Sequence, residues 1–199
     1  MRDLIPVNTQ YYSSITGETL HGDGINRFPD IAQDDEFITS DYIYSFAENG
    51  WRVKALDKDR TAYSAILDSV NGLKTISMDK AFLNCSRLKV APAIPKSVTD
   101  LVFAFSGCRK LVEAPKIPEG ARYLNNAFHW CESLTTAPEI PKSVVWMNGT
   151  FRNCTALKGV FVCHANIDSP NYTLLGTQIT AVEGSCSEKT KIKLMGTKH

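Results

Sequence analysis

A 23-residue repeat is the feature that most restricts how this chain of 199 residues can fold. Three apolar positions each recur four times at that spacing: Phe82, Phe105, Phe128 and Phe151; Cys85, Cys108, Cys131 and Cys154; Leu88, Leu111, Leu134 and Leu157. A unit this short cannot enclose a core alone, but stacked units place each apolar side chain over its equivalent. The spacing therefore predicts a solenoid whose core contains these twelve residues.

Proline dipeptides mark the rest of the unit. An Ala-Pro and an Ile-Pro dipeptide recur in three copies, within residues 91–95, 114–118 and 137–141. The fourth copy loses both prolines, as a terminal unit of an array commonly departs from the pattern. Its apolar stretch at residues 159–163 favours a β-strand, because proline cannot donate to a strand ladder and none is present there.

The unit F-x-x-C-x-x-L-x-x-A-P-x-I-P, over residues 75–164, resembles the BspA-type leucine-rich repeat of bacterial surface proteins. The resemblance implies a curved right-handed solenoid with a short parallel strand in each repeat, near the Leu-x-x-Ala-Pro-x-Ile stretch. It also implies an exported protein that binds host or partner molecules. Related arrays are similar to proteins that prophages of gut bacteria encode.

The segments around the repeats complete the predicted fold class, an α/β repeat formed by a right-handed leucine-rich-repeat solenoid of about four coils with a cap at each end. Strand alternation around Asn49-Gly50, over residues 42–46 and 51–55, predicts a β-hairpin. Apolar residues at helical spacing from Asp59 to Val70 predict a helix after it. The predicted parts are an irregular N-terminal arm (1–35), a hairpin-helix cap (36–72), the repeats (73–165) and a small C-terminal cap (166–199). Within the C-terminal cap, residues 178–182 and 191–194 show weak strand alternation.

Charge and hydropathy exclude several kinds of partner. Lys and Arg total 22 against 21 Asp and Glu, a net charge of +1, so neither nucleic acid nor a membrane surface would meet a basic field. No apolar run approaches the roughly 18–20 residues of a membrane span. The first 20 residues lack the apolar segment of a secretory signal, so export rests on the family resemblance and the localisation stays open.

Cysteine and histidine spacing gives no sign of catalysis, of a metal or of a cofactor. The six cysteines and four histidines include no C-x-x-C or H-E-x-x-H pattern. Equivalent cysteines in adjacent coils would lie about 4.8 Å apart, whereas disulfide Cβ atoms lie about 3.8 Å apart, so we expect buried free thiols.

Four other polar positions are interpreted individually. The adjacent pair Cys163 and His164 would point to opposite faces of a strand, which excludes a nucleophile and its base. Cys186 lies outside the column of equivalent cysteines, so the repeat does not require it to be buried. The acidic residues within 30–36 are interpreted as a solvated loop rather than a calcium site, and His129 as a surface residue.

Surface positions of the repeat provide the candidate binding residues. The expected strand-side stripe holds Lys89, Glu113, Lys116, Thr136 and Glu139. Large aromatic residues are enriched in protein interfaces, and the variable positions also carry Phe103, Tyr123, Trp130 and Trp146. We expect at least one cluster of these aromatic residues to be exposed.

The sequence thus favours a noncatalytic module that binds a protein or a glycan on a bacterial surface or within an exported protein. The alternative is a structural component of a prophage or virion assembly, in which the chain would form an oligomer.

Overall fold

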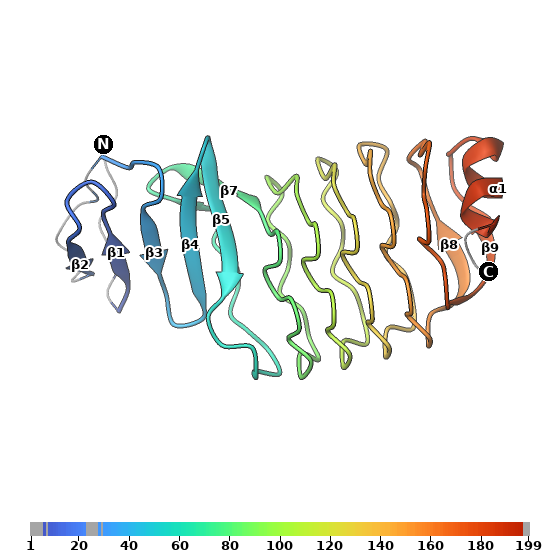
Figure 1. Ribbon diagram of the computed structural model, residues 1–199, viewed down its shortest axis with the longest axis horizontal. Coiled ribbons are helices and arrows are strands. Elements are labelled where there is room, and N and C mark those ends of the chain that lie inside the picture. Colours follow the sequence, from blue (N-terminus) through green and yellow to red (C-terminus); the bar gives the residue numbers. More distant parts are fainter. Residues whose placement is uncertain (1–5, 7, 23–27, 29, 197–199) are drawn as a thin grey trace.

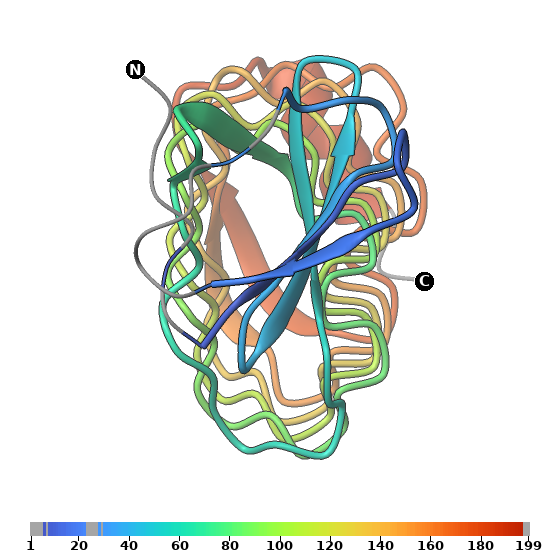
Figure 2. The same cartoon turned by 90° about the vertical axis from the view of Figure 1, so that its left-hand side faces the viewer.

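The computed structural model describes residues 6, 8–22, 28 and 30–196. These residues form an elongated molecule in which strands at one end lead into a stack of coils, and a helix lies at the other end (Figure 1). Viewed along the stack, successive coils superimpose (Figure 2).

A seven-stranded sheet forms the N-terminal end. Its strands are β1 (Gln10–Tyr12), β2 (Thr19–His21), β3 (Glu36–Ile38), β4 (Tyr42–Ala47), β5 (Gly50–Ala55), β6 (Ser69–Val70) and β7 (Leu73–Ser77). They are arranged in the order β2-β1-β3-β4-β5-β7-β6, with β5 and β7 parallel and the other pairs antiparallel. Residues 10–21 are therefore not an irregular arm, because they form two strands that extend this sheet.

The acidic segment beside this sheet is a solvated loop only in part, because Asp30 and Asp34 are exposed but Asp35 is not. Asp35 is buried, and its carboxylate accepts hydrogen bonds from the backbone N–H and hydroxyl of Ser14, at 2.7 and 2.8 Å, and from the Tyr11 hydroxyl. These hydrogen bonds hold the pKa of Asp35 below its ordinary value, although burial opposes the shift. Asp35 thus links the first strands to the sheet.

The predicted hairpin is confirmed in β4 and β5. Trp51 and Val53 are buried on one face while Arg52 and Lys54 are exposed on the other, as the alternation predicts. The two-residue turn is displaced by one residue from the expected Asn49-Gly50, because Ala47 pairs with Gly50.

Residues 56–70 contain no α-helix, contrary to the prediction. Backbone N–H groups of this segment donate to side chains next to the sheet, whereas in a helix they would donate to carbonyls of the segment itself. The Ser64 N–H donates to Asp41 at 2.6 Å, and the Leu67 N–H donates to the Tyr44 hydroxyl at 2.9 Å. The apolar residues do occur at helical spacing, but hydrogen-bond partners more than twenty residues away determine the backbone conformation of this segment.

The coils stack with their equivalent side chains in contact. All twelve predicted core residues of the Phe, Cys and Leu columns are fully buried. Neighbouring rings from Phe82 to Phe151 lie 5.2–5.4 Å apart with planes 1–5° from parallel. The thiols of Cys108, Cys131 and Cys154 each donate to a Phe carbonyl of the preceding coil, at 3.0–3.2 Å.

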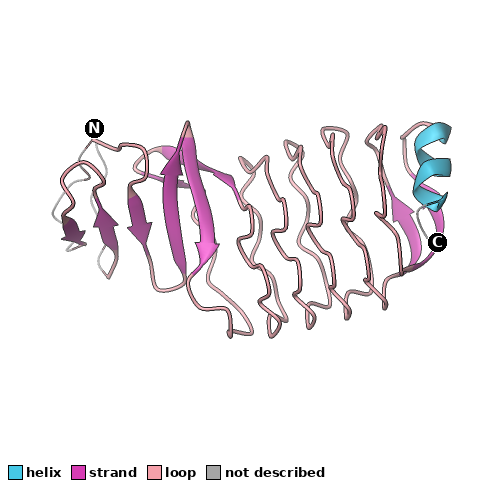
Figure 3. Cartoon of the chain, viewed as in Figure 1, coloured by secondary structure: helices cyan, strands magenta, loops and turns pink. Residues whose placement is uncertain are grey.

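The strand that the family resemblance implies in each repeat is reduced to single bridges in the proline-containing coils (Figure 3). Residues Val90, Glu113 and Thr136 are bridged in parallel, and the pairing ends there. Each of these coils has two prolines directly after the bridge, and neither can donate to a ladder. The proline-free copy forms the expected strand, β8 (Lys158–Val162), which pairs in parallel with β9 (Gln178–Glu183).

Two left-handed turn positions recur in every coil. The first is at Lys80, Phe103, Asn126, Gly149 and Tyr172; the second is at Asn84, Gly107, Trp130, Asn153 and Gly176. Both therefore occur five times in the described residues, one more than the Phe and Cys columns. In the fifth turn Leu174 takes the place of the ring and is fully buried.

The first ring of the Phe column is covered by an aromatic side chain from outside the repeats. The Tyr63 ring lies edge-on to Phe82 at 5.0 Å, and Tyr63 also donates a hydrogen bond to the Cys85 sulfur at 3.6 Å. At the other end, Phe151 contacts the Phe161 ring of its own coil edge-on at 5.6 Å and is followed in the column by the buried Leu174. Neither end of the column therefore exposes its apolar surface.

The C-terminal segment differs from its prediction in two places. Residues 191–194 belong to a helix, α1 (Glu188–Gly196), rather than a strand, and α1 packs against β9. The Ser187 hydroxyl accepts a hydrogen bond from the Thr190 N–H at 3.3 Å, which is an N-cap. Cys186 is buried rather than exposed, because it lies 23 residues after Cys163 and continues that buried column.

Candidate functional site

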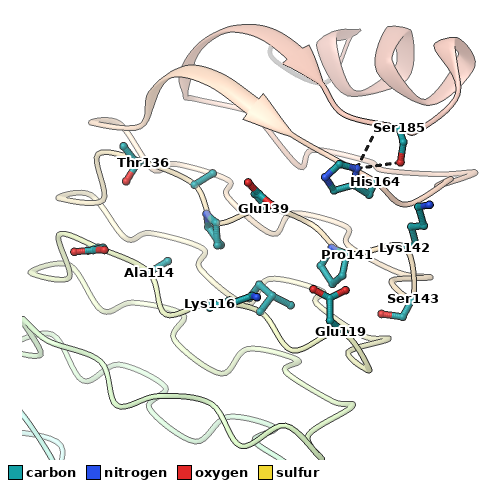
Figure 4. Close-up of a pocket in the computed structure, with 14 residues that line it drawn as sticks. Ala114, Lys116, Glu119, Thr136, Glu139, Pro141, Lys142, Ser143, His164 and Ser185 are labelled. Carbon is teal, nitrogen blue, oxygen red and sulfur yellow. Dashed lines mark hydrogen bonds between the residues drawn. The ribbon is translucent and has the colours of Figure 1, made fainter.

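A groove of about 770 Å³ runs along one side of the stacked coils and is the candidate binding site. It is formed by the Ala-Pro-x-Ile-Pro segments of two successive coils, together with the C-terminal end of the array (Figure 4). In each segment the Ile and the proline after it are buried, which turns the residues beside them outward. The repeat therefore places the same two positions of both coils on the groove: the residue before Ile and the residue after Ile-Pro.

Those two positions carry charged side chains of both signs. Lys116 and Glu139 precede Ile in their coils, and Glu119 and Lys142 follow Ile-Pro. Glu113 adds a carboxylate on the strand side of the groove. All five are exposed, and none forms an ion pair within the described part of the chain. The groove thus presents charges that are open to a partner, with no dominant sign.

The C-terminal end of the groove is formed by His164 and Ser185. The Ser185 backbone N–H donates to His164 Nδ1 at 3.1 Å, and the Ser185 hydroxyl lies 3.0 Å from the same nitrogen. Because a backbone N–H can only donate, Nδ1 is an acceptor and the neutral ring carries its proton on Nε2. Nε2 lies on the side of the ring that faces Glu139 and the groove (Figure 4).

The groove brings together four of the eight predicted binding residues: Glu113, Lys116, Thr136 and Glu139. Lys89 lines an adjacent hollow of about 580 Å³, which continues the groove because Glu113 and Lys116 line both.

The predicted aromatic residues lie elsewhere. Trp130 and Trp146 are exposed, and the half-buried Tyr123 ring lies 5.6 Å from Trp146, so an exposed aromatic cluster exists as predicted. None of the three lines the groove.

Sequence reasoning missed Glu119, Lys142, His164 and Ser185 as lining residues. The first two had a signal, since the position after Ile-Pro is polar in every complete copy. The contact between His164 and Ser185 had none, because it joins residues 21 positions apart. His129, predicted as a surface residue, is half-buried and its Nε2 has no hydrogen-bond partner among the described residues.

The cysteine side chains are unsuited to nucleophilic chemistry. All six are free and buried. Burial raises the pKa of Cys163 to about 12, and it raises the pKa of Cys108 and Cys131 well above the ordinary value. Cys163 lies inside the coil and His164 outside it, so the adjacent pair does not meet, as the strand argument predicts.

Neither a metal-ligand cluster nor a membrane-spanning helix occurs among the described residues. Within residues 8–22 and 30–196, no group of three His, Cys, Asp or Glu side chains is placed to hold a metal ion. The nine-residue α1 is too short to cross a bilayer, and no other helix of the described chain is long and apolar enough.

Three solved structures of leucine-rich-repeat proteins are similar to this chain. A leucine-rich-repeat protein of T. pallidum aligns with a TM-score of 0.51 at 20% identity, over 79% of this chain and 94% of that protein. A leucine-rich cell-surface protein of Faecalibacterium prausnitzii aligns at 0.45 and 23% identity, over 76% and 41%. A leucine-rich-repeat protein of Bacteroides ovatus aligns at 0.36 and 21% identity, over 72% and 57%.

The first of these alignments shows that the chain has the leucine-rich-repeat solenoid fold of a bacterial protein. No family model matches the chain, and no curated protein matches it.

Proposed function

We propose that this chain is a noncatalytic recognition module that binds a partner in the groove of its repeat array. The observation that carries the proposal is the set of five exposed charges along that groove, none of which is neutralised within the described chain. The stack holds the backbone positions of these charges before binding, so a partner with complementary charges meets them in a preformed arrangement.

The chemistry of the groove favours a polypeptide over a glycan as this partner. Two lysines and three glutamates alternate along the two rows, and such a pattern matches a chain that carries both acidic and basic side chains. Backbone amides of an extended segment would also find the Nε2–H of His164 and the hydroxyls of Thr136 and Ser143. Neutral sugars offer no charge to match these five.

We further infer that the module is of the BspA type and belongs to a bacterial surface or exported protein. The 23-residue unit and the fold of the T. pallidum protein support this inference. The predicted division, with residues 36–72 and 166–199 as caps around the array, is supported by Tyr63, which packs on the first ring of the Phe column, and by the buried Leu174, which follows its last ring.

A charge reversal in the groove tests the proposal. Peptides selected for binding from a displayed random library should lose at least tenfold in affinity against Lys116→Glu, which corresponds to about 1.4 kcal/mol. Lys110→Glu makes the same charge change at an exposed position outside the groove and should leave the affinity unchanged. Peptides that bind both variants equally, or a library that yields no binder, would refute the proposal.

Light scattering on the same samples distinguishes the structural alternative. A mass of 22.1 kDa leaves the groove free for a partner. A closed oligomer that Lys116→Glu dissociates would mean that copies of the chain occupy the groove, as in a virion component.

A further inference from the structure

A second surface of the array, separate from the groove, combines exposed aromatic rings with a row of amide groups. Its amides are Asn125, Asn148 and Asn171, one per coil; its rings are Tyr123 and Trp146, at equivalent positions of adjacent coils, and Tyr172, which follows Asn171 at a different position of the next coil. Together they are called the aromatic-amide face. The face belongs to the part of each coil where Asp100, Tyr123 and Trp146 are bridged in parallel. None of its six residues lines the groove.

The rings of this face are turned toward solvent. Trp146 is 58% exposed and Tyr172 is 59% exposed, although their size would favour burial. Tyr172 has a φ of 55°, at a turn position that is also left-handed at Lys80 and Phe103. The Trp146 ring has no such structural role and is open to a ligand.

The asparagines of the face are held in one orientation. Asn125 Oδ1 accepts the Asn148 N–H at 2.9 Å, and Asn148 Oδ1 accepts the Asn171 N–H at 3.1 Å. Because each Oδ1 faces a backbone donor, each Nδ2 group is turned away from that bond. Within the described chain, Nδ2 of Asn125 and of Asn148 has no hydrogen-bond partner. The row thus presents preoriented donors, separated by the coil spacing of about 4.8 Å.

We propose that the aromatic-amide face binds a linear glycan of equatorially linked pyranose rings, with its chain parallel to the long axis of the array. The apolar C–H faces of such sugars stack on aromatic rings, and their hydroxyl or N-acetyl oxygens accept from amide N–H groups. The rise per sugar in an extended chain of this kind is close to the coil spacing, so successive sugars lie over successive coils. Arg152, whose guanidinium lies 5.5 Å from the Tyr172 ring, adds further donors at the edge.

A second copy of the chain fits this face less well than a glycan. A protein interface that buried the rings would also desolvate the Nδ2 donors of the asparagine row, and each unpaired donor would weaken binding. Sugar hydroxyls satisfy those donors while the ring faces remain in contact. The same donors have no charge to attract the mixed-charge polypeptide proposed for the groove.

The test uses three hexasaccharides and the tryptophan emission of the full chain. The β-1,4-linked hexamers of N-acetylglucosamine and of glucose have the proposed geometry, and the α-1,4-linked glucose hexamer does not. We expect at least one β-linked hexamer to bind with a dissociation constant below about 1 mM by calorimetry and to shift the emission. Trp146→Ala should weaken this binding at least tenfold, and the α-linked hexamer should not bind.

Trp130→Ala is the matched control, because Trp130 is also exposed (41%) but lies at the other turn position, outside the face. It should bind the hexamer as the wild type does, and so should Lys116→Glu, which separates this proposal from that for the groove. The urea midpoint of Trp146→Ala, expected to be unchanged, shows that the variant folds. No binding by either β-linked hexamer, equal binding by Trp146→Ala, or a dimer that Trp146→Ala dissociates would overturn the proposal.

Discussion

At the residue scale, the array depends on a few positions where a side chain has no room. Gly184 follows β9 with a φ of 101°, and a Cβ placed on it would lie 2.2 Å from the backbone oxygen of Cys163. Gly107 has a φ of 77°, and its Cβ would lie 2.4 Å from Asn84 Oδ1 in the preceding coil. The first conflict involves backbone that cannot move aside, whereas the second involves the end of a side chain that can rotate.

Gly184→Ala should therefore destabilise the protein severely. We expect the free energy of unfolding to fall by at least about 2 kcal/mol more than in Gly72→Ala. Gly72 also has a positive φ, of 75°, but open space where the methyl group would be, so it reports the backbone cost alone. Urea unfolding of the two variants measures the difference, and equal midpoints would show that the contact with Cys163 does not restrict this position.

At the scale of the element, the cysteine column links neighbouring coils through thiol donors. Cys108 and Cys131 each donate to a buried Phe carbonyl of the preceding coil. Each of these carbonyls also accepts a backbone N–H within its own coil, from Cys85 at 3.0 Å and from Cys108 at 3.1 Å, so the thiol is its second donor. The column is thus a structural element, and its chemistry is that of protonated thiols.

This protonation predicts a stability that falls at alkaline pH. In the unfolded chain thiols ionise near about pH 8.5, while burial keeps the pKa of Cys108 and Cys131 well above the ordinary value. Below pH 8.5 these thiols are protonated in both the folded and the unfolded state, so they add no pH dependence to the free energy of unfolding. Above it only the unfolded state loses protons, so stability falls by about 1.4 kcal/mol per pH unit for each such thiol.

Urea midpoints between pH 7.5 and 9.5 measure this slope below the ionisation of the tyrosines. Cys131→Ala removes one of the titrating groups and should make the decrease with pH less steep, although it lowers the stability at pH 7.5 by creating a cavity. An identical slope in the variant and the wild type would contradict the assignment.

At the scale of the whole molecule, the chain is a one-dimensional stack in which each coil contacts its neighbours. The seven-stranded sheet ends the stack on one side, and β9 with α1 ends it on the other (Figure 1). Loss of one end should therefore open the nearest coils first, while the distant sheet remains folded.

The C-terminal helix allows a matched test of this behaviour. Leu194 is fully buried and Ile192 is 72% exposed, on the same helix. Leu194→Ala should increase amide hydrogen exchange in β8 and β9 at least tenfold and leave β4 and β5 protected, whereas Ile192→Ala should change neither. Equal deprotection of β4 and β5 in Leu194→Ala would show that the molecule unfolds as one cooperative unit.

The 23-residue periodicity was enough to predict the stack and its core. Residues that repeat every 23 positions must contact their own equivalents, so Phe105 or Cys131 is assigned to a buried column without any knowledge of the rest of the fold. The β4–β5 hairpin followed from alternation for a similar reason, since its partners are close in sequence.

Segments whose partners are distant in the chain and outside the repeat could not be predicted in this way, because their conformation depends on tertiary contacts. The Ser64 N–H is bound by Asp41, so an apolar spacing typical of a helix forms none. His164 is held by Ser185, which completes the groove from 21 residues away. The spacing of residues within one segment does not indicate such contacts. They form only when the rest of the chain packs and brings the two segments together.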